Sequence, residues 1–223
     1  MTEITLVRHG QASFGTDDYD RLSPLGHQQA QWLGEYYTSR ELYFDRIIIG
    51  GQLRHRQTAE GILTAFHCDA ELEVHEGFNE YNFEALYHSF CQQYPEQAHS
   101  DFDDRRHFYA VLRKALQAWS QDELTGPLPE TWQHFHQRIE AAMEFAASIA
   151  KKKVLVISSG GAISMTMKQP LNVDPDTMIS LNLQMINTAY SQLLKTRSRT
   201  QLLSFNNTPH LDNTDRIDTV TYS

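Results

Sequence analysis

The tripeptide Arg8-His9-Gly10 ends a short apolar run and combines three residue types that suit phosphoryl chemistry. Arg8 offers a planar pair of N–H donors that matches the oxygens of a phosphate. Its charge also disfavours the imidazolium form of His9, which would keep this imidazole neutral and nucleophilic near neutral pH. Gly10 removes a side chain where a ligand has to approach the backbone closely. The tripeptide alone is equally compatible with a histidine that is merely hydrogen-bonded.

A second segment with phosphate-binding character reads LRHRQTAE and spans residues 53–60. Arg54 falls in the first turn of an expected helix, where its side chain and the backbone N–H groups can share one anion. Thr58 lies one turn later on the same face of that helix. If this segment stood alone, Arg54 and Arg56 would ordinarily be interpreted as solvated surface charges.

The elements that must position these residues are predicted from apolar runs and helix-start signals. Ser23-Pro24 is typical of a helix start, with serine as the N-cap and proline at the first helical position. Strands are expected at 4–7, 44–49, 72–74 and 154–157, followed by a hairpin over 185–196 and 200–205. Helices are expected at 24–37, 53–66, 108–119, 131–150 and 160–168.

Strands that alternate with helices indicate an α/β fold whose mainly parallel sheet is covered on both faces. In such sheets, ligands bind beyond the carboxyl ends of the strands. Both Arg8-His9-Gly10 and Ser158-Ser159-Gly160 follow a predicted strand directly. We therefore expect the two loops to meet in one pocket.

Taken together, these motifs resemble those of the histidine phosphatase superfamily, which includes cofactor-dependent phosphoglycerate mutases and many small-molecule phosphatases. The resemblance rests on LVRHG at 6–10, LR at 53–54 with QTAE at 57–60, and FNE at 78–80, and it extends through LSPLG at 22–26 and the run 154–161. It implies a phosphoglycerate mutase-like, three-layer α/β/α sandwich. We expect a single domain over residues 1–223, with a helical cap inserted at about 86–150.

The resemblance also implies roles for individual residues. His9 matches the histidine that becomes transiently phosphorylated, and Arg8 and Arg54 match the two phosphate-binding arginines. Glu80 matches the acid that protonates the leaving group, a role that needs a carboxyl group held partly protonated. Gln11 and Ser13 match positions that often contact phosphate. From its residue type alone, Glu80 is also compatible with an ordinary surface charge.

The chain departs from the family pattern at Ser159, which stands where the second family histidine is expected. A neutral serine hydrogen bond in place of a charge-assisted one would cost on the order of 1–2 kcal/mol in the transition state. Ser158, Ser159 and the backbone N–H of Gly160 could compensate by cradling the phosphate oxygens. His210 could also reach the pocket, although a structural or solvated histidine is its more ordinary interpretation. The family's usual serine near Gly50-Gly51 is missing as well.

Composition limits the classes of partner. The formal net charge is −9, which disfavours nucleic acid and acidic membranes because both need a broad basic surface. The chain shows no signal-peptide pattern and no apolar run of membrane-spanning length, and its two cysteines fit reduced thiols. We therefore expect a cytoplasmic protein. No metal-binding spacing and no nucleotide-binding glycine motif occurs, so no metal and no cofactor is predicted.

We expect, on this basis, a phosphatase of a small phosphorylated metabolite that acts through a phosphohistidine on His9. Its partner would be that metabolite or inorganic phosphate. A catalytically impaired module that binds phosphate or a phospholigand stays open as an alternative, and so does a phosphoglycerate mutase-type phosphotransferase. The sequence specifies neither the substrate nor the oligomeric state.

Overall fold

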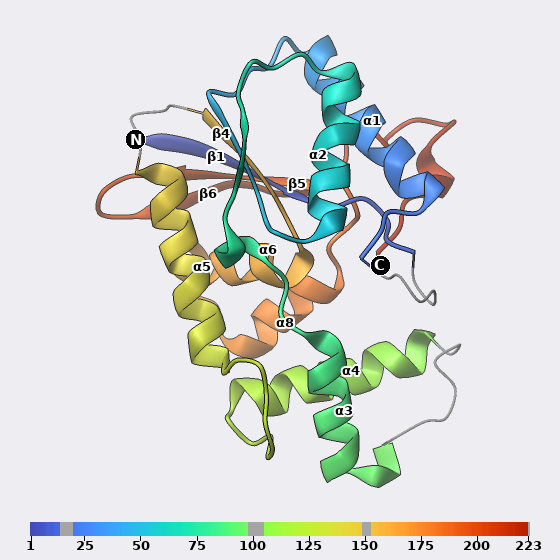
Figure 1. Cartoon of the computed structure of the whole chain (residues 1–223), viewed down its shortest axis with the longest axis vertical. Coiled ribbons are helices and arrows are strands. Elements are labelled where there is room, and N and C mark those ends of the chain that lie inside the picture. Colours follow the sequence, from blue (N-terminus) through green and yellow to red (C-terminus); the bar gives the residue numbers. More distant parts are fainter. Residues whose placement is uncertain (14–19, 98–104, 149–152, 223) are drawn as a thin grey trace.

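A mainly parallel sheet forms the centre of the computed structural model, which describes residues 1–13, 20–97, 105–148 and 153–222 (Figure 1). Within these residues, six strands form one sheet in the order β3-β2-β4-β1-β5-β6. They are β1 (Thr2–Arg8), β2 (Arg46–Ile49), β3 (Leu72–Val74), β4 (Lys153–Ser158), β5 (Tyr190–Lys195) and β6 (Thr200–Asn207). The first four pair in parallel, and β5 and β6 are antiparallel. The predicted α/β class is confirmed.

Helices cover both faces of the sheet (Figure 1). They are α1 (Pro24–Ser39), α2 (Leu53–Ala65), α3 (Phe83–Gln93), α4 (Arg105–Ser120), α5 (Trp132–Ala147), α6 (Gly160–Thr166), α7 (Lys168–Leu171) and α8 (Pro175–Leu183). Because side chains alternate along a strand, Ile47 and Ile49 pack with α1 and α2, whereas Ile48 packs with the helices of the other face. This alternation gives the predicted three-layer sandwich.

The first helix begins as its sequence predicts. The Ser23 side chain accepts a hydrogen bond from the backbone N–H of Gly26, and Pro24 occupies the first helical position. An N-cap of this kind stabilises a helix by about 1 kcal/mol. The same start holds the loop after β1 in place, since the Ser23 backbone N–H donates to the Gln11 carbonyl oxygen over 2.8 Å.

The C-terminal hairpin begins later than predicted. We expected its first strand to start at Met185, but β5 starts at Tyr190. Thr188 adopts a left-handed φ of 58°, and its backbone N–H donates to the Arg8 carbonyl oxygen over 3.1 Å. The segment before β5 is therefore a turn that lies against the end of β1. Helix α8 was not predicted, because its residues have no clear apolar face.

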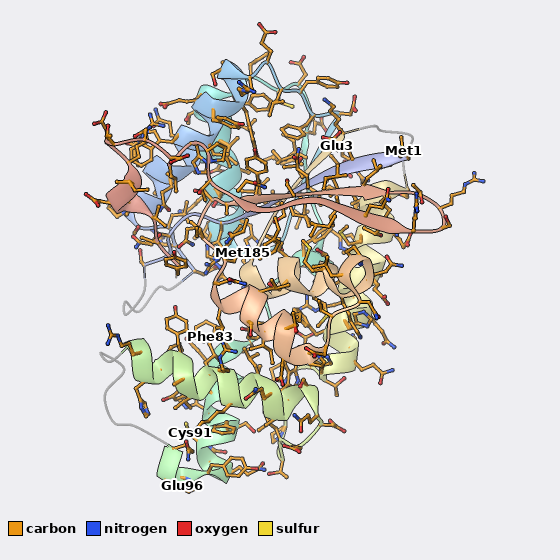
Figure 2. All side chains as sticks on the ribbon, turned by 180° about the vertical axis from the view of Figure 1, so that it is seen from behind. Met1, Glu3, Phe83, Cys91, Glu96 and Met185 are labelled. Atoms are coloured by element: carbon orange, nitrogen blue, oxygen red, sulfur yellow. The ribbon has the colours of Figure 1, made fainter. Side chains whose placement is uncertain are left out.

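Helices α3 and α4 form the end of the molecule farthest from α1 and α2 (Figure 1). Figure 2 shows Phe83 at the end of α3 that faces the sheet, and Cys91 and Glu96 farther out. Residues 98–104 and 149–150 of the predicted cap lie outside the described residues. Whether this region acts as a cap on a single domain stays a prediction. In the part of the chain that is described, no helix has the length and apolar character needed to cross a membrane.

Candidate active site

The loops after β1 and β4 meet at one edge of the sheet, as predicted. The two strands are parallel neighbours, and Arg8 pairs with Ser158 in their register. The backbone N–H of His9 continues this ladder by donating to the Ser158 carbonyl oxygen over 2.9 Å. Residues that lie about 150 positions apart in the sequence are thus brought into direct contact.

His9 is held in one tautomer by its own loop. Its Nδ1 atom lies 2.7 Å from the Gly10 carbonyl oxygen, and because a carbonyl can only accept, Nδ1 must carry the proton. The Nε2 atom then keeps its lone pair. Burial, followed by the charges of Arg54 and Arg8, holds the pKa of His9 well below its usual value. The imidazole is therefore neutral and able to act as a nucleophile.

Helix α2 fixes the loop that carries His9. The Thr58 hydroxyl accepts a hydrogen bond from the backbone N–H of Gly10 over 3.0 Å. The same hydroxyl donates to the Arg54 carbonyl oxygen over 2.7 Å. The loop also needs glycine, because a Cβ on Gly10 would lie 2.4 Å from the carbonyl oxygen of Gly26. Thr58 and Gly10 are thus positioning residues for the nucleophile.

Both arginines are buried beside His9 and are oriented by other groups. Arg8 donates through Nη1 to the Met185 carbonyl oxygen and, over 2.8 Å, to that of Tyr222. Arg54 forms an ion pair of 2.7 Å with Asp20. We did not predict a role for Asp20 or for Tyr222. Neither their residue types nor their spacing identifies them as site residues, because Asp20 reaches the site from a loop and Tyr222 from the C-terminal tail.

Glu80 lies in the same pocket as His9 and the two arginines. Its two carboxylate oxygens accept hydrogen bonds from the backbone N–H groups of Gly161, over 2.9 Å, and Tyr81, over 3.2 Å. Burial nevertheless raises the pKa of Glu80 above its usual value. This placement fits a proton donor and does not fit a solvated surface charge.

The pocket itself has a volume of about 60 Å³. It is lined by Arg8, His9, Arg54, Glu80, Tyr81, Phe83, Phe108, Tyr109, Leu112, Asn182, Leu183 and Tyr222. One wall is thus charged, and helices α3 and α4 contribute a wall of aromatic and apolar side chains to the same pocket. Sequence patterns indicated the charged wall alone, because aromatic residues on a helix ordinarily belong to a core.

The two weaker candidates, Gln11 and Ser13, have hydrogen-bond partners within the protein. The Gln11 side-chain oxygen accepts a hydrogen bond from the Ser23 hydroxyl over 2.7 Å. The Ser13 backbone N–H donates to the Arg21 carbonyl oxygen over 2.8 Å. Neither residue is among those described as lining the pocket. Their contact with phosphate stays a prediction.

The serines after β4 have protein partners. The Ser158 hydroxyl donates to the Phe78 carbonyl oxygen over 2.6 Å, and the Ser159 hydroxyl lies 2.7 Å from Nε2 of His55. Gly160 lies against the pocket, since a Cβ there would be 3.6 Å from Nε of Arg8. The predicted cradle for phosphate oxygens stays a prediction, and His55 is a neighbour of Ser159 that we did not expect.

His210 is buried away from this pocket. Its Nε2 atom lies 2.8 Å from the Thr188 hydroxyl oxygen, and burial lowers the pKa of His210 to about 3. The histidine therefore supports the turn that packs against the end of β1. This is the structural role that we regarded as the more ordinary one.

We expect the burial of His210 to make the protein less stable as the pH falls. The unfolded chain takes up a proton near the usual histidine pKa, whereas folded His210 does so only near a pKa of about 3. The loss should approach about 1.4 kcal/mol per pH unit below pH ~6.5. Urea unfolding of wild type and His210→Gln at several pH values would measure it. An equally steep pH dependence in the variant would contradict this assignment.

Replacing Glu80 with glutamine should slow hydrolysis most for esters with poor leaving groups, because these need a proton donor. Loss of general acid catalysis typically costs about 10²- to 10⁴-fold in rate. Since the acid form is required and the pKa of Glu80 is raised, wild-type kcat should fall as the pH rises through this pKa. Rates for an alkyl phosphate and an aryl phosphate would be compared, with the exposed Glu84→Gln variant as control. Equal losses on both esters would argue against proton donation.

Across the described residues, no group of three or more histidine, cysteine, aspartate or glutamate side chains is arranged to hold a metal ion.

Comparison with known proteins finds one matching family and many solved structures with a similar fold. The model of the histidine phosphatase superfamily (branch 1) matches residues 4–208. No curated protein matches the chain. Among solved structures, Bacillus stearothermophilus YhfR is similar with a TM-score of 0.71 and 18% identity, over 94% of this chain and 99% of that one.

Two further solved structures are similar. A putative alpha-ribazole-5'-P phosphatase from Escherichia coli has a TM-score of 0.67 and 19% identity, over 92% of this chain and 96% of that one. A phosphoserine phosphatase mutant from Entamoeba histolytica, in complex with phosphoserine, has a TM-score of 0.65 and 20% identity, over 95% of this chain and 100% of that one. At these identities the likeness concerns the fold.

Proposed function

Because the chain belongs to the histidine phosphatase superfamily and is an enzyme of that phosphatase type, we propose that it hydrolyses small phosphate monoesters through a phosphohistidine on His9. The protonation state of His9 is the observation that supports this proposal most strongly. The hydrogen bond from Nδ1 of His9 to the Gly10 carbonyl oxygen leaves Nε2 unprotonated in a pocket that also contains Arg8 and Arg54.

The reaction has two steps on this account. In the first, Nε2 of His9 attacks phosphorus, the bond to the ester oxygen breaks, and Glu80 gives its proton to the departing alcohol. In the second, Glu80 accepts a proton from water, whose oxygen attacks phosphorus and releases inorganic phosphate from His9. Arg8 and Arg54 stabilise the charge on the phosphoryl oxygens in both steps, because charge-assisted donors are strongest where water is excluded.

Helices α3 and α4 supply the selectivity for the organic part of the ester. Phe83, Phe108, Tyr109 and Leu112 form an aromatic and apolar wall of the pocket that also contains the two arginines. This wall favours an ester whose organic part has apolar surface. The phosphoserine phosphatase and the putative alpha-ribazole-5'-P phosphatase with similar folds support small phosphate monoesters as the class. We therefore propose that the predicted cap selects the substrate.

A module that binds phosphate without turnover is the second candidate, and Ser159 is the observation that favours it. A panel of aryl, alkyl, sugar and amino acid phosphates separates the two functions. We expect phosphate release from at least one ester, inhibited by orthovanadate. A His9→Asn preparation, purified identically, identifies contaminating phosphatases. Binding of inorganic phosphate with no release from any ester would refute hydrolysis and establish the module.

A further inference from the structure

His55 stands directly behind the position where the second family histidine is missing. It belongs to the first turn of α2 and is fully buried, as is Ser159. Its Nε2 atom lies 2.7 Å from the Ser159 hydroxyl oxygen. Its ring centre lies 5.8 Å from that of His9. An imidazole is therefore present at this wall of the site, but it comes from a different element.

We propose that His55 takes over the task of the missing second histidine, acting through Ser159 on the transferring phosphoryl group. The 2.7 Å contact between Nε2 and the hydroxyl oxygen fits either direction of donation. In the tautomer that the proposal requires, Nε2–H of His55 donates to the Ser159 oxygen, and that hydroxyl keeps its own hydrogen for a phosphoryl oxygen. Two linked hydrogen bonds also polarise each other, so the serine becomes a stronger donor than it would be alone. The proposal rests on the function proposed above, and His55 is its positioning residue.

Two departures from the family pattern become one exchange on this view. The first is Gly50, near which the family serine is missing. A Cβ at Gly50 would lie 2.3 Å from Nδ1 of His55, so a side chain there would collide with the imidazole. Glycine at this position makes room for His55. Serine at position 159 does the same on the other side of the ring.

The same geometry explains why histidine at 159 and His55 exclude each other. A carbon in place of the Ser159 hydroxyl oxygen would lie about 2.7 Å from Nε2 of His55. Ordinary contact between such atoms is about 3.5–4.0 Å. Both residues are fully buried, so a histidine at position 159 in the rotamer of Ser159 would collide with the imidazole of His55. One imidazole fits here, and in this chain α2 supplies it.

The electrostatics of the site keep His55 uncharged, and the hydrogen-bonded pair of His55 and Ser159 is therefore a neutral relay. Burial, and then the charge of Arg54, hold the pKa of His55 well below its usual value. A neutral imidazole beside His9 leaves the nucleophile unprotonated, whereas a cation would compete with it for the phosphate. The relay therefore donates hydrogen bonds without adding a third positive charge to Arg8 and Arg54.

Moving the histidine from position 55 to position 159, where the family pattern has it, tests the proposal. We expect His55→Ala to lower kcat for an aryl phosphate about 5- to 30-fold, because the Ser159 donor that it orients and polarises is weakened. Ser159→His alone should also lower kcat, since its ring meets His55. The double variant His55→Ala/Ser159→His should recover to within about 5-fold of wild type. A double variant as impaired as the product of both single effects would overturn the exchange.

A milder cycle covers the case in which Ser159→His fails to fold. Ser159→Ala should lower kcat about 5- to 30-fold, the effect of one weakened hydrogen bond. Residues that act through one another are non-additive, so adding His55→Ala should cost no more than about twofold beyond the worse single variant. Fully multiplicative losses would refute the relay. Ser164→Ala, which removes another buried hydroxyl from α6, controls for packing and should keep wild-type kcat.

Failure of the relay and failure of the proposed function give different results. An active wild type with His55→Ala at full kcat would overturn the relay and leave the phosphatase intact. If wild type hydrolysed no ester, calorimetry with inorganic phosphate would still test the pair. We then expect binding about 3- to 10-fold weaker in His55→Ala, the loss of roughly one hydrogen bond. Unchanged phosphate affinity would count against the relay.

Discussion

His9→Asn is expected to lower kcat for phosphate monoesters by about 10⁴-fold or more, the scale of loss when a covalent nucleophile is removed. Asparagine can keep a hydrogen bond to the Gly10 carbonyl oxygen, which His9 now makes over 2.7 Å. It has no lone pair that can attack phosphorus, because its amide nitrogen is not nucleophilic. The loss would therefore appear in kcat, while the pocket keeps both arginines.

Steady-state rates with p-nitrophenyl phosphate, together with thermal melting, would measure this effect. The matched control is His27→Asn, which changes an exposed histidine on α1 and should leave kcat unchanged. Affinity for inorganic phosphate should fall by far less than the rate. A folded His9→Asn variant that retained a tenth of wild-type kcat would rule out His9 as the nucleophile, since about tenfold corresponds to only about 1.4 kcal/mol.

Arg54→Ala is expected to lower kcat/KM by about 10²- to 10³-fold, the typical cost of removing one preorganised donor to transition-state charge. Arg54 is buried beside His9 and is held by Asp20 over 2.7 Å, so its guanidinium is already oriented before substrate binds. Because the donor acts on developing charge, kcat should fall along with affinity. Removing the arginine leaves Asp20 partly exposed, which limits the cost to folding.

The same helix provides a close control for this variant. Arg56 lies two positions away on α2 and is exposed, so Arg56→Ala removes the same charge without touching the pocket. We expect its kcat/KM to stay within about twofold of wild type, since exposed charges contribute little. Equal losses in both variants would mean that Arg54 acts only through the general field of the protein.

The sheet and the charged wall of the site were predictable because each rests on a local pattern. The apolar runs that end at Arg8 and Ser158 predict buried strands, and parallel strands bring their carboxyl ends to one edge. Ser23-Pro24 marks the start of α1 through a hydrogen bond within a few residues. His9, Arg8, Arg54 and Glu80 follow from motifs beside such elements. The structure brings these four residues into one pocket.

The remaining features depend on contacts between distant segments. Asp20 meets Arg54, and the Tyr222 carbonyl oxygen meets Arg8, across gaps of 34 and 214 positions. His55 lies between Arg54 and Arg56, and no local pattern distinguishes it, because its contact with Ser159 spans 104 positions. Thr188, in the turn before β5, combines a left-handed φ of 58° with a backbone hydrogen bond to Arg8 at the end of β1. A pattern within a single segment does not predict contacts between residues so far apart in the sequence.

The most direct measurement for the whole account is detection of the phosphohistidine itself. Wild-type protein would be mixed with p-nitrophenyl phosphate, quenched rapidly at alkaline pH and digested, and its peptides would be sequenced by mass spectrometry. We predict one phosphoryl group on His9, which appears within the first turnover and is absent from His9→Asn. Turnover by wild type with phosphate on another residue, or with none on any residue when the intermediate is trapped, would contradict the account.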